Sequence, residues 1–444
     1  MARRSLSSMQ AALGASRADR VRALTVPVVG SLLLAGTVAY GLIATAGESS
    51  LGTKLPPFLV RWMPEASPWA LAAGVALAAG MLLAPRLRAP SLSPEAFAAS
   101  TLALGLVLRL LLGVARGGLG DLYAVYDVPN DESSNEYLPA LPAFDFGARV
   151  FLDTFAEVGT ALPVHAVGHP PGLLLMLHWL AIDSAPGMAA LTIAAGALSI
   201  PLAYVLAREL LDESRARTAT LLYVFAPSAL LYSATSADAL FATAGMVAAV
   251  TLLARRPILR ALGPVALALA SFFSYANLAV GAFAALLTLR RDGPQRALVL
   301  SAACLVALVA FYALLHLATG YDPIGALRSV ESVYREGVAA GRPYGFWLFG
   351  SPAAFLLAAG VPLAWLALRS LGEGASVAVA LFAVVGVAAV LGFSKAETER
   401  IYQFLVPLLC VAAACTVREG RLQAVLTALA AQALAVQLLF YTVW

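Results

Sequence analysis

Runs of apolar residues recur along almost the whole chain, and most charged residues fall in the short segments between them. Of the 444 residues, 61% are hydrophobic and only 12% are charged. A water-soluble domain needs far more polar surface than this. The chain is therefore expected to be an all-α polytopic membrane protein.

The apolar runs also predict how often the chain crosses the bilayer. Segments long enough for a span, roughly 17–22 residues, number about 13 between residues 25 and 442. With this count, most of the 29 basic residues fall on the predicted cytoplasmic side, as basic residues near span ends generally do. The basic segment 1–24 lacks a small-residue cleavage site and is predicted to be a cytoplasmic tail.

The stretch LPVHAVGHPPG, residues 162–172, precedes the apolar run LLLMLHWLA. Proline lacks a backbone donor and has a fixed φ, so Pro170 and Pro171 predict the start of a helix. If this helix crossed the membrane, the arginine-rich segment 208–217 would move to the outer side. We therefore expect a short helix that lies at the outer surface of the membrane.

Most of the 25 acidic residues fall on the predicted outer side, many of them between residues 117 and 168. A carboxylate that removes a proton from an acceptor hydroxyl is what a glycosyl or acyl transfer requires. Glu136 is the first candidate because it lies beside Tyr137 in an apolar setting, where burial would shift its pKa. Asp131 and Asp127 are substitutes, and a solvated loop without catalytic function is the alternative.

Further candidates occur near the ends of predicted spans on the same side. His169, with His165, could bind a phosphate oxygen, a metal ion or a sugar hydroxyl, or could simply bond to the backbone at a helix start. Asp238 occupies a span end, where an ionised group is costly without a partner or a wet cavity.

The stretch ETERIYQF opens a late span with Glu397, Glu399 and Arg400. An arginine at a helix N-terminus can form a phosphate site, whereas the alternative is a structural ion pair with a neighbouring glutamate. The loop 317–348 adds Arg335 and Tyr344, which could bind a lipid head group or a sugar, or could line the interface.

Several functions are not supported by any pattern. The sequence has no phosphate-binding loop, dinucleotide fingerprint, zinc-protease motif or nucleophile elbow. The net charge of +4 follows the membrane topology and does not indicate nucleic-acid binding. The three cysteines all lie inside apolar runs and form no metal-ligand spacing. Any chemistry is therefore expected on the extracytoplasmic side.

Together these motifs resemble the GT-C superfamily of integral-membrane glycosyltransferases, of the protein-mannosyltransferase and aminoarabinose-transferase type, in an actinobacterial form. The resemblance is carried, in this order, by NEY at 135–137, HPPG at 169–172, SADALF at 236–241 and ETERIY at 397–402. Asn135 departs from the family pattern, which has an aspartate before the glutamate. The domains expected are the tail 1–24, two N-terminal transmembrane helices in 25–94, a GT-C-like core in 95–405 with a large outer loop at 117–185, and C-terminal transmembrane helices in 406–444.

The resemblance implies an inverting transfer of a sugar from a polyprenyl-phosphate donor to an extracytoplasmic acceptor, in the plasma membrane. Glu136 would be the base, and a divalent metal, Mg²⁺ or Mn²⁺, could take part with Asp238 and His169 as ligands. The expected substrate-binding residues are His165, His169, Asp238, Arg335, Tyr344, Glu397, Glu399 and Arg400. The rival hypothesis is a transporter or flippase of lipid-linked sugars, and a third is a polymerase or ligase that acts on lipid-linked oligosaccharide.

Overall fold

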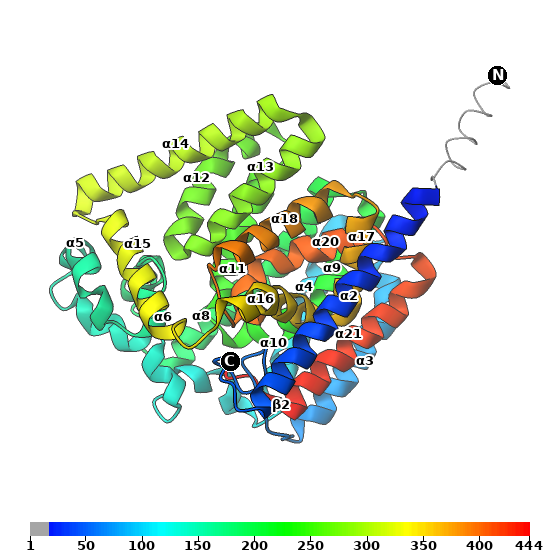
Figure 1. The fold of residues 1–444 in the computed structure, drawn as a ribbon, viewed down its shortest axis with the longest axis horizontal. Coiled ribbons are helices and arrows are strands. Elements are labelled where there is room, and N and C mark those ends of the chain that lie inside the picture. Colours follow the sequence, from blue (N-terminus) through cyan, green and yellow to red (C-terminus); the bar gives the residue numbers. More distant parts are fainter. Residues whose placement is uncertain (1–16) are drawn as a thin grey trace.

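The structure is a computed structural model that describes residues 17–444, apart from the side chains of residues 17–20 and of Glu419. The predicted tail, residues 1–24, lies mostly outside the described residues. The described chain is mostly helical with almost no strand, as predicted (Figure 1). The first three long helices are α2 (Arg17–Ala46), α3 (Trp69–Leu87) and α4 (Pro94–Gly113).

A long segment without a span follows α4 and ends where α8 begins. It contains short 3-10 helices and three short α-helices. These are η1 (Leu119–Leu122), η2 (Ala124–Tyr126), η3 (Asp131–Asn135), η4 (Leu138–Phe144), α5 (Ala148–Val158), η5 (Gly159–Ala161), α6 (Val164–Val167) and α7 (Gly172–Trp179).

The remaining chain forms a helical bundle. Its elements are α8 (Ala185–Leu210), α9 (Glu213–Phe225), α10 (Pro227–Thr235), α11 (Asp238–Leu252), α12 (Pro257–Phe273), η6 (Tyr275–Asn277), α13 (Leu278–Asp292), α14 (Pro294–Thr319), α15 (Pro323–Ser332), the π-helix η7 (Val333–Val338), α16 (Tyr344–Ala359), α17 (Val361–Gly372), α18 (Ser376–Leu391), α19 (Thr398–Ile401), η8 (Tyr402–Leu405), α20 (Val406–Ala414), η9 (Glu419–Arg421) and α21 (Leu422–Leu439).

Six helices of the described chain are long and apolar enough to cross a membrane, namely α2 from Val21 on, α3, α4, α8, α14 and α21. The pairs α10–α11 and α16–α17 also qualify if each is one bent span, which gives up to eight. A membrane protein is thus supported, but the expected 13 spans are not confirmed. Several predicted spans correspond to shorter helices that other helices surround.

The lengths of α9 and α20, 13 and 9 residues, contribute to this difference, because neither helix is long enough to cross a bilayer. Every residue of α20 is buried, as is every residue of α9 from Ala216 to Phe225. A helix that is apolar all round fits the centre of a helical bundle as well as it fits a bilayer. Hydrophobicity alone therefore does not distinguish these core helices from spans.

The outward surfaces of α2 and α14 are apolar instead. Exposed side chains on α14 include Leu305, Val306 and Leu314, and those on α2 include Leu32 and Ile43. Apolar surface of this extent on a helix longer than a bilayer is thick indicates contact with lipid chains. Figure 1 shows α2, α3 and α21 together on one flank and α12, α13 and α14 on another.

The short helix predicted after the proline pair is present. α7 begins at Gly172 directly after Pro171, and its eight residues are too few to span a bilayer. Its leucines pack inward against the core. In α5, Phe151 and Phe155 are buried, whereas Phe146 precedes the helix and is exposed.

A two-stranded antiparallel sheet joins distant parts of the chain. Strand β1 (Arg61–Trp62) lies in the connection between α2 and α3, and it pairs with β2 (Phe440–Tyr441), which follows α21. The guanidinium of Arg116 donates hydrogen bonds to the carbonyls of Met63 and Phe440 beside it. This arrangement fixes the direction of residues 442–444, which enter the core next to the loop after α4.

Candidate active site

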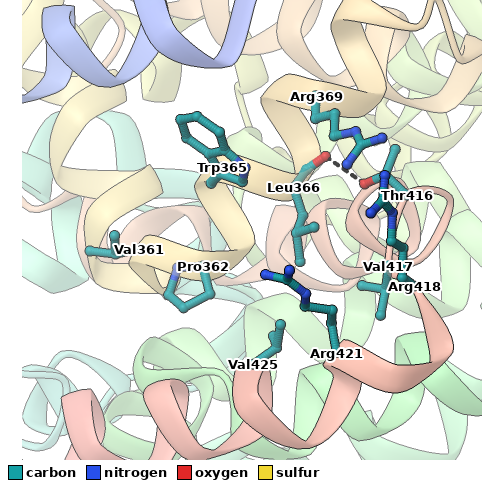
Figure 2. Close-up of a pocket in the computed structure, with 10 residues that line it drawn as sticks. All are labelled: Val361, Pro362, Trp365, Leu366, Arg369, Thr416, Val417, Arg418, Arg421 and Val425. Atoms are coloured by element: carbon teal, nitrogen blue, oxygen red, sulfur yellow. Dashed lines mark hydrogen bonds between the residues drawn. The ribbon is translucent and has the colours of Figure 1, made fainter. Parts of the chain in front are cut away.

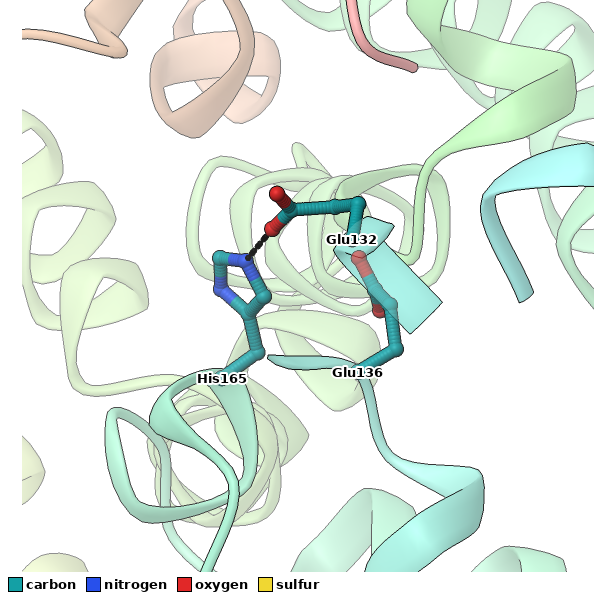
Figure 3. A group of neighbouring side chains, drawn as sticks. All are labelled: Glu132, Glu136 and His165. Carbon is teal, nitrogen blue, oxygen red and sulfur yellow. Dashed lines mark hydrogen bonds and ion pairs between the residues drawn. The ribbon is translucent and has the colours of Figure 1, made fainter. Parts of the chain in front are cut away.

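Glu132, Glu136 and His165 form a compact group in the segment between α4 and α8 (Figure 3). The side chain of Asn130 accepts a hydrogen bond from the backbone N–H of Glu132 and starts η3, whose single turn brings the two glutamates together. His165 comes from α6, and its Nε2 lies 3.0 Å from Oε1 of Glu132. The ligand atoms of the three side chains lie within 4.8 Å of one another.

Glu136 is the most deeply buried member of this group, with 2% of its surface exposed. Its Oε1 accepts a hydrogen bond of 2.9 Å from the indole N–H of Trp444. Its Oε2 has no hydrogen-bond partner among the described residues. A buried carboxylate oxygen without a donor is costly, so it is typical of a site that receives a proton or a ligand.

Trp444 connects this group to a second one. One face of its indole lies over the guanidinium of Arg400, whose Cζ is 3.7 Å from the ring centroid. Its edge faces His165, with 5.7 Å between the ring centroids. A cation held against an indole face is stabilised by the ring quadrupole, more strongly where water is excluded. Trp444 therefore contacts both Glu136 and Arg400 and connects the two groups.

The second group is a buried chain of alternating charges. The guanidinium of Arg400 donates to Asp238 and, at 2.7 Å, to Glu397. Glu397 in turn accepts a hydrogen bond of 2.8 Å from Arg342. Two arginines thus face two carboxylates, and the formal charges cancel. Each partner offsets the desolvation cost of its neighbour, which none of these groups could offset alone.

The backbone that presents Glu397 is strained. Both Ala396 and Glu397 adopt the left-handed region, with φ of 68° and 62°. Two successive non-glycine residues in that region cost free energy, which the surrounding contacts must supply. Hydrogen bonds from Thr398 to the carbonyl of Ser351, and from Arg342 to the carbonyl of Lys395, hold the segment in place.

His169 occupies an aromatic pocket beside the charged groups. Its ring lies 4.4 Å from that of Phe241 and 6.3 Å from that of Tyr137, centroid to centroid. Burial lowers the pKa of His169 to about 4. A neutral imidazole at physiological pH can donate one hydrogen bond and accept another, as recognition of a sugar hydroxyl requires.

The surroundings of the buried carboxylates shift their pKa values in opposite directions. Burial raises the pKa of Glu136 above its usual value, although His165 and the indole N–H of Trp444 oppose the shift. Burial by itself would raise the pKa of Glu397, but Arg400 and Arg342 outweigh it and lower that pKa to about 2. Glu397 is therefore a permanent anion, whereas Glu136 has the affinity for protons that a general base needs.

Glu399 lies in the same segment but turns away from Arg400. Its Oε1 accepts a hydrogen bond of 2.6 Å from the backbone N–H of Leu59, in the connection between α2 and α3. Its Oε2 has no partner among the described residues, and burial raises its pKa to about 7. Glu399 thus anchors the α2–α3 connection instead of joining the ion-pair chain.

This pKa leads to a testable pH dependence. The unfolded carboxyl has a pKa of about 4.5, so the folded chain binds the proton of Glu399 more tightly. The stabilisation is complete below the unfolded value and is lost as the pH rises through about 7. We expect Glu399→Gln to gain stability relative to wild type between pH 5 and pH 8, by up to about 3 kcal/mol. Thermal unfolding in nanodiscs at both pH values measures this gain.

The matched control is Glu331→Gln, because Glu331 is an exposed carboxylate with 57% of its side chain accessible. This control should change by the same amount at both pH values. If Glu399→Gln and Glu331→Gln follow the same pH profile, Glu399 does not carry the shifted proton.

The group of Glu132, Glu136 and His165 could hold a metal ion. Two carboxylates and one imidazole leave open coordination positions, as catalytic metal sites do, and the unpartnered Oε2 of Glu136 fits a ligand role. An imidazole in the set favours Mn²⁺ or Zn²⁺ over Mg²⁺. The metal ligands expected from the sequence, Asp238 and His169, lie elsewhere, in the ion pair and in the aromatic pocket.

Four other predicted residues are not in this assembly. Asp127 and Asp131 line a separate surface cavity of about 480 Å³ together with Arg61 and Tyr441. Arg335 forms an exposed ion pair with Glu331. The hydroxyl of Tyr344 donates to the carbonyl of Val390 at 2.6 Å. These four residues were predicted from the composition of their loops, and composition does not determine where a side chain points.

Sequence reasoning missed three members of the assembly. Glu132 lies four residues before Glu136, and the start signal at Asn130 could have indicated a short turn that brings the two glutamates close together. Arg342 was one of several arginines in the loop 317–348. Trp444 gave no local signal, since only the pairing of β1 with β2 carries it to Glu136.

Comparisons with known proteins identify no relative of this chain. No family model matches the chain, and no curated protein or solved structure matches it.

Proposed function

We propose that the protein is a membrane glycosyltransferase that moves a sugar from a polyprenyl-phosphate donor to an acceptor outside the plasma membrane. The observation that carries the proposal is the unpartnered, buried Oε2 of Glu136. It lies in a connected charged site that Trp444 links to Arg400 and Asp238. The resemblance of the sequence motifs to GT-C enzymes supports the same class.

In the proposed reaction, the acceptor oxygen attacks the anomeric carbon of the sugar. The bond between that carbon and the phosphate oxygen breaks, and the polyprenyl phosphate leaves with the bonding electrons. Oε2 of Glu136 takes the hydroxyl proton of the acceptor. Because the phosphate is already a good leaving group, the protein has to supply mainly orientation and charge stabilisation.

The surrounding residues have defined parts in this proposal. The indole N–H of Trp444 fixes Oε1 of Glu136 and so directs Oε2 toward the acceptor. Arg400, whose Nε has no partner among the described residues, faces the leaving phosphate. A divalent cation held by Glu132 and His165, beside Glu136, would add charge stabilisation for that phosphate and leave Oε2 of Glu136 free to take the proton. The neutral ring of His169 would bind a sugar hydroxyl.

The proposal is tested with the purified full chain in nanodiscs. Radiolabelled polyprenyl-phosphate mannose, arabinose, glucose and galactose are added one at a time, with and without Mn²⁺. We expect label to leave one donor, by transfer or by slow hydrolysis. Binding of a donor with no release under any of these conditions would contradict an enzymatic function.

A specific observation favours the transporter as the second candidate. The pairs α10–α11 and α16–α17 are bent by 113° and 114° at breaks of a few residues. Broken helices are typical of secondary transporters, in which their ends form the substrate site. Asp238 begins α11 directly after one break. Movement of a fluorescent lipid-linked sugar across proteoliposomes, without release of its sugar, would support this candidate.

A further inference from the structure

A second site, with basic residues, lies at the other end of the bundle from Glu136. It is a cavity of about 470 Å³ between α17, α20 and the start of α21 (Figure 2). α21 connects the two sites, because it begins beside this cavity and ends at β2 next to Trp444. Its 18 residues rise by about 27 Å, close to the thickness of the hydrocarbon core. The two sites are therefore expected at opposite membrane surfaces.

Positive charge accumulates on one side of the cavity. Arg369, Arg418 and Arg421 all line it. Arg369 is paired with Glu373 at 3.0 Å. Among the side chains that the structure describes, none forms an ion pair with Arg418 or Arg421. The described side chains that line the cavity thus carry three positive charges and no negative one.

The opposite side of the cavity is apolar. Val361, Pro362 and Trp365 line it, and both Val361 and Trp365 are exposed. In Figure 2 these three side chains lie to the left on α17, and Arg369, Arg418 and Arg421 lie to their right. A ligand that fits both sides has a compact anionic group and an adjoining apolar chain.

The sidedness of the chain indicates which molecule has this chemistry. Arginines 369, 418 and 421 fall on the side that the positive-inside rule assigns to the cytoplasm. Basic pockets between helices on that side are suited to the head groups of anionic lipids, which are abundant in the inner leaflet. The cavity volume lies in the range of ligand pockets.

We propose that this cavity is a binding site for an anionic glycerophospholipid. Its phosphate is held by Arg418 and Arg421, and one acyl chain lies along Trp365 and Val361. This site is separate from the proposed active site and does not depend on the proposed glycosyltransferase function.

The test uses native mass spectrometry of the delipidated full chain in detergent. Phosphatidylglycerol is titrated against phosphatidylcholine, which has the same phosphate but no net charge. We expect wild type to bind phosphatidylglycerol at least about tenfold more tightly. The double variant Arg418→Gln/Arg421→Gln should lose roughly 10- to 30-fold in that affinity.

The matched control is Arg256→Gln/Arg260→Gln, which removes the same charge at exposed positions on the same predicted side. Its phosphatidylglycerol affinity should equal that of wild type. Equal affinity of wild type for the two lipids would overturn the proposal, as would an equal loss in both double variants. Full displacement of phosphatidylglycerol by inorganic phosphate would also overturn it, because the acyl chain would then contribute nothing.

Discussion

Glu136→Gln is expected to lower kcat for sugar transfer by roughly 10²- to 10⁴-fold, the usual contribution of a general base. Glutamine keeps the size of the side chain and an oxygen that accepts the indole N–H of Trp444, now bonded at 2.9 Å. It removes only the capacity to take a proton at Oε2. KM and the melting temperature should therefore stay close to their wild-type values. Single-turnover transfer from the preferred donor measures the effect.

The control variants for this prediction are Asp131→Asn and Asp127→Asn. Both aspartates are nearby carboxylates, yet they line a separate surface cavity. We expect each to keep at least about half of the wild-type kcat. A large loss in Asp131→Asn with none in Glu136→Gln would move the base to Asp131. Recovery of Glu136→Gln with excess Mn²⁺ would show that Glu136 binds the metal ion and does not transfer the proton.

Some features of this molecule could be predicted because they depend on local chemistry. The apolar runs indicated a helical membrane protein, and the proline pair indicated the helix that begins at Gly172. The sidedness of charged residues placed Glu136, Asp238 and Arg400 on one face. The structure brings these three into one connected site through Trp444. Sidedness was informative because buried charges need partners, and partners have to lie at the same depth.

Other features depend on contacts between distant segments. The number of spans could not be predicted reliably, because buried helices such as α20 have the same apolar composition as spans. The position of Trp444 depends on a two-residue strand pairing that leaves no periodic pattern. Arg400 was expected either to attract phosphate or to pair with a neighbouring glutamate, and its pair with Glu397 matches the second of these. Its pair with Asp238, which lies far away in the sequence, becomes visible only in three dimensions.

Those ion pairs lead to the largest expected effect on stability. Arg400→Gln leaves the carboxylates of Asp238 and Glu397 buried without their shared cation, and both side chains are nearly inaccessible. Breaking a buried pair by removal of one partner typically costs about 3–5 kcal/mol. It also removes the cation from the face of Trp444. We expect the melting temperature in nanodiscs to fall by roughly 3–5 °C.

Arg335→Gln is the matched control for Arg400→Gln, since Arg335 also pairs with a glutamate, at 2.8 Å, but is 64% exposed. An exposed pair contributes about 0–1 kcal/mol, so this variant should melt close to wild type. The added change Asp238→Asn should cost less in the Arg400→Gln background than in wild type, because the unpaired carboxylate is then neutralised. Equal melting temperatures for Arg400→Gln and Arg335→Gln would contradict a stabilising role for the buried charges. Arg400 would then be free to exchange its carboxylate partners for the phosphate of a donor, and its effect would appear in KM.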